Sequence, residues 1–304
     1  MSENDDKSGT PVQAEPVQAE PMQAEPMQAE AVYAEQIPSR PSDRWQYLSD
    51  NRGVIVRRAL LATALGGALP IPVLDDYFAT RIRAGMFMKI AQNRGVGLPA
   101  AAAEVLAEAK GTSRLRSLTT TAATIIALRL AWRKFFTLLA AGRGAEEAAT
   151  TYQAGLLFDH YCARLHTGPA IDRTLAAMLR RTVHGSAGAA GKEALVAIFK
   201  DGGKTLGKSL LQAPGWVNRK MSTLLERWIR SRGNPEALQD DDAELSGDDA
   251  RWLDKAAEVV DARLLSLGNE YLDALVGQFE KEWRALQQAR SADGPAPSAD
   301  HRHD

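Results

Sequence analysis

An apolar stretch that leads into an amphipathic helix pattern, residues 59–95, constrains the fold more than any other part of this sequence. Residues 59–69 are mostly small and apolar, and a Pro-Ile-Pro turn at 70–72 separates them from the helix pattern. In that pattern apolar residues recur at every fourth position: Leu74, Phe78, Ile82, Met86 and Ile90. This spacing lines one face of an α-helix. Because such a face must be covered, we expect it to pack in a helical core.

The same periodicity recurs along the chain and indicates the fold class. Asp75 and Asp76 open the first helix, since carboxylates are favoured beside the free amides of a first turn, and Gly95 ends it. Further helices are expected from Pro99, over about 113–141, 145–165, 171–184, 195–210 and 216–232, and over 249–290 with a bend at Gly268. No window alternates apolar and polar residues as a strand does. The sequence therefore predicts an all-α, bundle-like domain.

Composition divides the chain into five parts. Residues 11–35 hold five copies of a five-residue unit of the PVQAE type. A period of five fits neither helix nor strand, and the repeated prolines interrupt a helix, so we expect 1–43 to be a disordered acidic arm. The other parts are a basic helical domain (44–232), an acidic linker (233–249), a long helix or helix pair that packs on the domain (250–290), and a disordered tail (291–304).

Charge is distributed unevenly between these parts. Residues 1–43 carry 2 basic and 9 acidic side chains, 44–232 carry 28 and 12, and 233–304 carry 7 and 17. The net charges are −7, +16 and −10. This asymmetry favours an anionic membrane surface or an acidic protein as partner of the middle part, in preference to nucleic acid. Two alternatives stay open: the acidic ends mask the middle, or both signs alternate on the folded surface.

The most basic helix pattern, 216–232, is amphipathic. Its candidate residues for contact with lipid or another anionic partner are Arg219, Lys220, Arg227, Trp228, Arg230 and Arg232. Such a helix can lie on an anionic membrane with its apolar face dipped and its cations at the headgroups. The alternative is a surface helix that docks on the core.

The apolar run 59–74 has three possible environments. It is shorter than the roughly 20 residues that cross a bilayer, which favours burial in the core. Gly66 and Gly67 allow close backbone approach, which suits a core helix or a membrane-inserted hairpin. The sequence leaves core burial, shallow insertion and full spanning of a membrane open.

The order of features in 59–95 resembles that of known families. This order is a small-residue apolar segment, Pro-Ile-Pro, an Asp, and an Arg-bearing helix that ends in Ile90, Ala91 and Gly95. It is similar to the order in the uncharacterised helical families typified by EcsC and by the YcjF domain that accompanies Era-like GTPases in bacteria. The resemblance implies a mostly helical, membrane-associated protein and brings no catalytic residues. The chain departs from those families at 92–94, Gln-Asn-Arg.

One segment matches a nucleotide-binding motif. Residues 202–209 fit G-x-x-x-x-G-K-S, in which Gly202 and Gly207 would shape the loop, Lys208 would reach phosphate and Ser209 would bind magnesium. The same residues also fit a glycine-rich basic helix, because Leu195, Phe199, Gly202, Leu206 and Leu210 follow helical spacing. Nucleotide binding is therefore an alternative function.

Other candidate chemistry is sparse. Asp159, Cys162 and His166 share one face of an expected helix at i, i+3 and i+7, but spacing marks no fourth metal ligand. We therefore predict no metal site, no cofactor and no catalytic constellation. Cys162 is the single cysteine, which excludes an internal disulfide and fits a reducing compartment.

These patterns together predict a non-catalytic helical protein that is peripherally membrane-associated or acts as a scaffold. The acidic N-terminus lacks the order of a secretory signal, so we expect the chain to face the cytosol, with contact at the inner face of the membrane. A second alternative is a soluble homo-oligomer held by the apolar seam of 250–290, in which apolar residues recur at helical spacing: Leu253, Val260, Leu264, Leu267, Tyr271, Leu275 and Phe279.

Overall fold

The computed structural model describes residues 43–65, 72–108, 142–187, 191–211 and 251–292, and all structural statements refer to them. This part of the chain is 88% helical and contains no strand, so the prediction of an all-α fold is confirmed. Five predicted features lie wholly or almost wholly outside it: the acidic arm, the helix at about 113–141, the basic helix 216–232, the acidic linker 233–249 and the tail.

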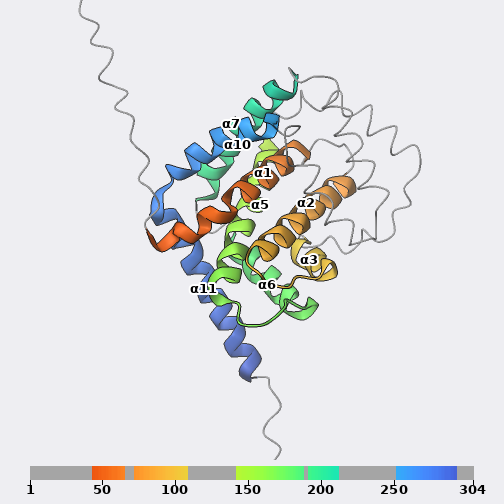
Figure 1. Ribbon diagram of the computed structural model, residues 1–304, viewed down its shortest axis with the longest axis vertical. Helices are drawn as coiled ribbons and strands as arrows, with labels where there is room; N and C mark the ends of the chain where they lie inside the picture. Colours follow the sequence, from red (N-terminus) through yellow and green to blue (C-terminus); the bar gives the residue numbers. More distant parts are fainter. Residues whose placement is uncertain (1–42, 66–71, 109–141, 188–190, 212–250, 293–304) are drawn as a thin grey trace, which may run out of the picture. The chain divides into compact units, whose positions relative to one another are not determined.

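The described part of the chain contains helices in the following order (Figure 1). They are η2 (Asp43–Leu48, a 3-10 helix), α1 (Ser49–Leu65), α2 (Pro72–Asn93), α3 (Ala100–Ala107), α5 (Gly142–His160), η4 (Tyr161–Leu165, a π-helix), α6 (Arg173–Ser186), α7 (Lys192–Leu211), α10 (Arg251–Leu265) and α11 (Gly268–Ala292). The predicted helices at 145–165 and 171–184 correspond to α5 with η4 and to α6. Pro99 is the N-cap of α3 and precedes its first turn.

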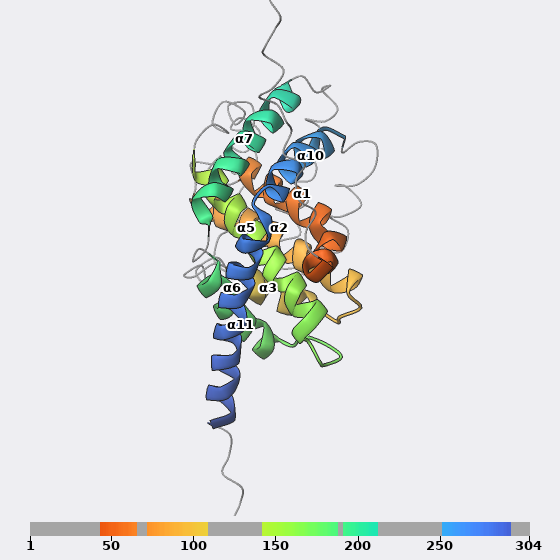
Figure 2. The same ribbon diagram turned by 90° about the vertical axis from the view of Figure 1, so that its left-hand side faces the viewer.

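Helices α1 and α5 form the centre of the described core. They make the most extensive helix pair, and α2, α7 and α10 pack around α1, as the two ribbon views show (Figures 1 and 2). Ile55 and Leu60 of α1 and Leu157 and Phe158 of α5 are fully buried. Phe158 also packs in a tilted arrangement against Phe87 of α2, with 4.9 Å between ring centroids, so aromatic packing joins α5 to α2 at this point.

The apolar run 59–74 is part of this core wherever the structure describes its side chains. Ala59, Leu60 and Leu61 have no exposed surface, and Ala62 is 1% exposed. Within α2, Ile82, Met86 and Ile90 are likewise buried, as the four-residue spacing predicts. The described helices include none that is both long enough and apolar enough to cross a membrane. Residues 66–71 lie outside the described part.

The C-terminal helices pack on the same body. Helix α10 lies against α7 and α1, and α11 against α6 and α5. Gly268 has φ +73°, a left-handed conformation that glycine adopts without strain, and it separates α10 from α11 at the predicted bend. Of the seam residues, Leu253, Val260, Leu264, Leu275 and Phe279 are buried, and Leu267 and Tyr271 are partly buried against the core. In the described part of the chain, this seam is therefore largely covered by the chain's own helices.

Candidate functional site

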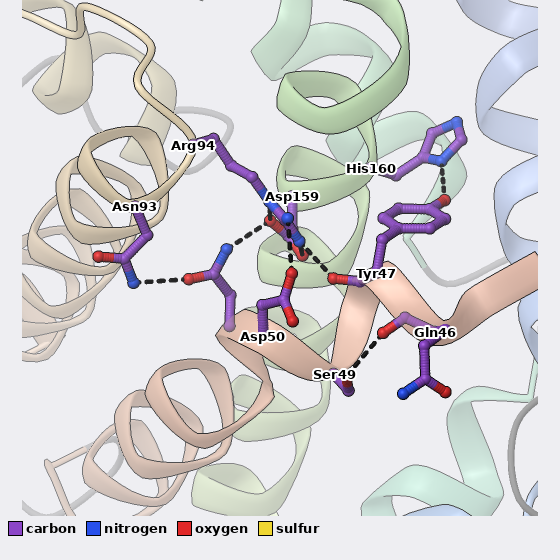
Figure 3. Close-up of polar contacts among 9 residues, drawn as sticks. Gln46, Tyr47, Ser49, Asp50, Asn93, Arg94, Asp159 and His160 are labelled. Atoms are coloured by element: carbon purple, nitrogen blue, oxygen red, sulfur yellow. Dashed lines mark hydrogen bonds and ion pairs between the residues drawn. The ribbon is translucent and has the colours of Figure 1, made fainter. Parts of the chain in front are cut away.

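A cluster of polar side chains lies where η2, the start of α1, and the carboxyl-terminal ends of α2 and α5 meet (Figure 3). Asp159, near the end of α5, is its centre and has no exposed surface. Sequence alone places this carboxylate directly after Leu156, Leu157 and Phe158, three core residues. A buried carboxylate must be paired to remain charged, so the nature of its partners decides what the cluster can do.

Arg94 binds Asp159 with both arms of its guanidinium group. Arg94 Nε donates to Asp159 Oδ1 at 2.7 Å, and Nη2 donates to Oδ2 at 2.9 Å. This two-point contact is the strong form of an ion pair. Hydrogen bonding to Asp159 raises the pKa of Arg94, so the guanidinium stays charged.

The backbone after α2 explains how Arg94 reaches this position. Arg94 is the first residue after the helix, and Gly95 takes φ +68°. The Val96 amide then donates back to the Ala91 carbonyl at 2.8 Å, which closes the helix end. The following turn is held by Gly97, whose amide donates to the Pro169 carbonyl at 3.2 Å. The predicted helix stop at Gly95 therefore also orients the arginine.

Two asparagines and a second carboxylate complete this half of the cluster (Figure 3). Asn51 Nδ2 donates to Asp159 Oδ1 at 2.6 Å, and Asn93 Nδ2 donates to Asn51 Oδ1 at 2.7 Å. Arg94 Nη1 donates to Asp50 Oδ2 at 2.9 Å. Each of these contacts joins two different helices or their ends. The arrangement therefore fixes α1, α2 and α5 relative to one another by hydrogen bonds that satisfy buried groups.

The second half of the cluster is a bridge through His160. The Tyr47 hydroxyl lies 2.5 Å from His160 Nδ1, and His160 Nε2 lies 3.1 Å from Glu280 Oε1 on α11. The Arg164 guanidinium of the π-helix lies 4.6 Å from the Tyr47 ring centroid, a cation–π distance. Hydroxyl, imidazole and carboxylate thus follow one another in the order of a nucleophile–base relay. However, burial raises the pKa of Tyr47 to about 12, which keeps the phenol protonated and disfavours attack by its oxygen.

The predicted face of Asp159, Cys162 and His166 is not assembled. His166 lies beyond the helix end with an extended backbone, because the π-helix closes at Leu165. Asp159 is held by Arg94 and Asn51, and burial raises the pKa of the Cys162 thiol. No group of three or more His, Cys, Asp or Glu side chains in the described ranges could hold a metal ion.

The structure places the nucleotide-motif residues 202–209 inside α7. In the interior of an α-helix the backbone amides donate to carbonyls, whereas the phosphate loop needs them free. Gly202 and Gly203 are buried, and Gly202 contacts α10. The helical conformation of Gly202, Gly207, Lys208 and Ser209 therefore argues against the nucleotide-binding alternative.

The basic residues Arg219, Lys220, Arg227, Trp228, Arg230 and Arg232 lie outside the described residues. Conversely, sequence reasoning did not find Tyr47, Asn51, Arg94 or Glu280 as members of a site. Asp159 was singled out, but as a member of one helix face with Cys162 and His166.

Comparison with known proteins gave no match to a family model, to a curated protein or to a solved structure.

Proposed function

We propose that this chain is a non-catalytic helical protein that binds an anionic membrane surface peripherally from the cytosolic side, through its basic segment 216–232. The observation that carries the proposal is the location of the excess positive charge. Residues 109–141 and 212–232 together hold 11 lysines and arginines and a single acid, Glu226, which is a net +10 out of the +16 of the basic middle part.

Many arginines of the described helices are paired within the chain. Arg57 Nη2 lies 2.7 Å from Asp254 of α10, and Arg180 Nη1 lies 3.0 Å from Glu108 after α3. Arg52 pairs with Asp261, and the buried Arg83 pairs with Glu147. Paired cations contribute little attraction to an external anion, so the excess charge of 109–141 and 212–232 is the best candidate for contact.

Core burial of 59–62 supports a surface mode over insertion. Residues Ala59 to Ala62 contact other helices and offer no apolar area to lipid. Attraction of lysine and arginine to anionic lipid is worth about 1 kcal/mol per cation near the surface. The cations of 216–232 can therefore supply useful affinity together with the apolar face of that segment.

Flotation of the full chain with liposomes tests this proposal. We expect binding to vesicles that contain phosphatidylserine, no binding to pure phosphatidylcholine, and loss of binding at high salt, since exposed charges are screened within about 10 Å at 0.1 M. Replacement of Arg219, Lys220, Arg227 and Arg230 by Glu should abolish flotation without changing helical content by circular dichroism. Binding that survives this replacement would overturn the role of 216–232.

A matched control separates a local site from general charge. Arg173, Arg181, Lys200 and Lys255 are exposed on described helices, and their replacement by Glu changes the net charge equally. We expect this control to float like the wild type. Equal loss in both variants would show that overall charge alone drives binding. Absence of flotation in every condition would instead favour an acidic protein partner and a scaffold function.

A further inference from the structure

The His160 bridge connects α11 to the rest of the fold through a single titratable ring. His160 is 3% exposed, and both ring nitrogens are engaged, Nδ1 by Tyr47 of η2 and Nε2 by Glu280 of α11. Phe279, next to Glu280, meets the His160 ring edge-on with centroids 6.2 Å apart. A change in the protonation of this ring therefore acts directly on the contact between α5 and α11.

We propose that the His160 bridge is a pH-sensitive latch, which holds α11 on α5 at neutral pH and loosens it in mild acid. In the neutral ring, Nε2–H donates to the Glu280 carboxylate, and the Nδ1 lone pair accepts the Tyr47 hydroxyl proton. A second ring proton at Nδ1 removes that acceptor, so the Tyr47 O–H must turn away. The protonated ring is also a cation in a site that water barely reaches.

Charged groups around the ring shift the pKa of His160 in both directions. Glu280 and the neighbouring Asp159 favour the imidazolium, whereas Arg164 of the π-helix opposes it. Two of these groups have a cation of their own: Asp159 is paired with Arg94, and Glu280 lies 3.2 Å from the exposed Arg284. Tyr47 and Trp45 face the ring from η2 as a phenol and an indole, without charge. Burial is the largest effect, and it lowers the pKa of His160.

The direction of the pH dependence follows from this balance. When α11 is undocked and the ring is hydrated, His160 should titrate near its ordinary value of about 6.5. The docked state then binds fewer protons than the undocked state. Docking is therefore fully stabilised above that pH and weakens as the pH falls below it.

Hydrogen exchange of the full chain tests the latch, with rates corrected for the intrinsic effect of pH. Between pH 7.5 and 5.5 we expect protection of α11 to fall several-fold, while α2 changes little. His160→Gln should remove this pH dependence. His166→Gln is the matched control, because His166 is half-buried nearby and its only described polar partner is Tyr161, so the pH dependence should persist. Protection that does not change with pH, or a pH dependence kept in His160→Gln, would overturn the proposal.

A second measurement uses the wild-type chain and does not depend on the folding of a variant. The chain has five histidines, so their ring signals can be followed individually by NMR. We expect His160 to titrate below free imidazole and the loss of α11 protection to follow the same pH range. Titration of His160 at or above about 6.5 would contradict the latch.

Discussion

The cluster around Asp159 and the ion pairs that flank α10 use the same kinds of side chain in different surroundings. Asp159 is fully buried and the Arg94 side chain is 14% exposed, whereas Arg57 and Asp254 are 40% and 33% exposed. Asp201 of α7 and Arg263 of α10 are more exposed still. Asn51 and Asp50 supply further hydrogen bonds to Asp159 and Arg94, respectively, whereas the exposed pairs of α10 remain in contact with water.

This difference shows that an ion pair can fix a helix arrangement only where water cannot replace the partner. Removal of one buried partner leaves the other charge unsolvated, whereas an exposed partner is simply hydrated. Helix α10 must therefore be held mainly by its apolar contacts with α1 and α7, and the ion pairs contribute little beside them. Three substitutions and one control substitution test this contrast.

The largest effect is expected for Asp159→Asn. The amide keeps the shape of the carboxylate but cannot neutralise Arg94, and its NH2 group faces guanidinium donors. We expect a loss of about 3–5 kcal/mol in the free energy of unfolding, the range for a broken buried ion pair. Urea denaturation followed by circular dichroism measures it. A loss below about 1 kcal/mol would place the Asp159 pair in the same category as surface pairs.

An intermediate effect is expected for Gly202→Ala in α7. An added Cβ would lie 2.2 Å from Val260 Cγ2 of α10 and 3.3 Å from Leu60 Cδ2 of α1, so the helices must shift. We expect a loss of about 1–3 kcal/mol from overpacking, measured by urea denaturation. Addition of Val260→Ala should recover part of this loss, because it removes the clashing methyl groups.

Gly277→Ala is the matched control for Gly202→Ala. Gly277 lies inside α11, is exposed, and has no atom within 4 Å of an added Cβ. The same substitution should therefore stabilise the chain by about 0.5–1 kcal/mol, since alanine is the better helix former. Equal stability of the two variants would show that α7 and α10 are not in close apolar contact at Gly202.

The smallest effect is expected for Asp254→Asn. Arg57 loses its partner but is 40% exposed and can be hydrated. We expect a loss of about 0–1 kcal/mol that shrinks as salt is added. Urea midpoints at low and high salt measure it. A loss comparable to that of Asp159→Asn would remove the distinction between the two regions.

Much of the fold could be predicted because helices are encoded locally. The four-residue spacing of Ile82, Met86 and Ile90 identified the buried face of α2, Gly95 marked its end, and the bend predicted at Gly268 falls where α10 gives way to α11. The site was much less predictable. Asp159 and His166 were assigned to one face on the assumption of a continuous α-helix, but a π-helix follows α5 and His166 lies beyond its end.

The sequence by itself determined the all-α class, the approximate ranges of α2, α5 with η4, α6 and α7, and which faces of these helices are apolar. These depend on neighbouring residues within one or two turns. The tertiary structure decided which polar groups meet. Arg94 and Asp159 are 65 residues apart, and His160 and Glu280 are 120 apart. Such pairs depend on how whole helices rotate and cross when their apolar faces pack, and local spacing does not encode that geometry.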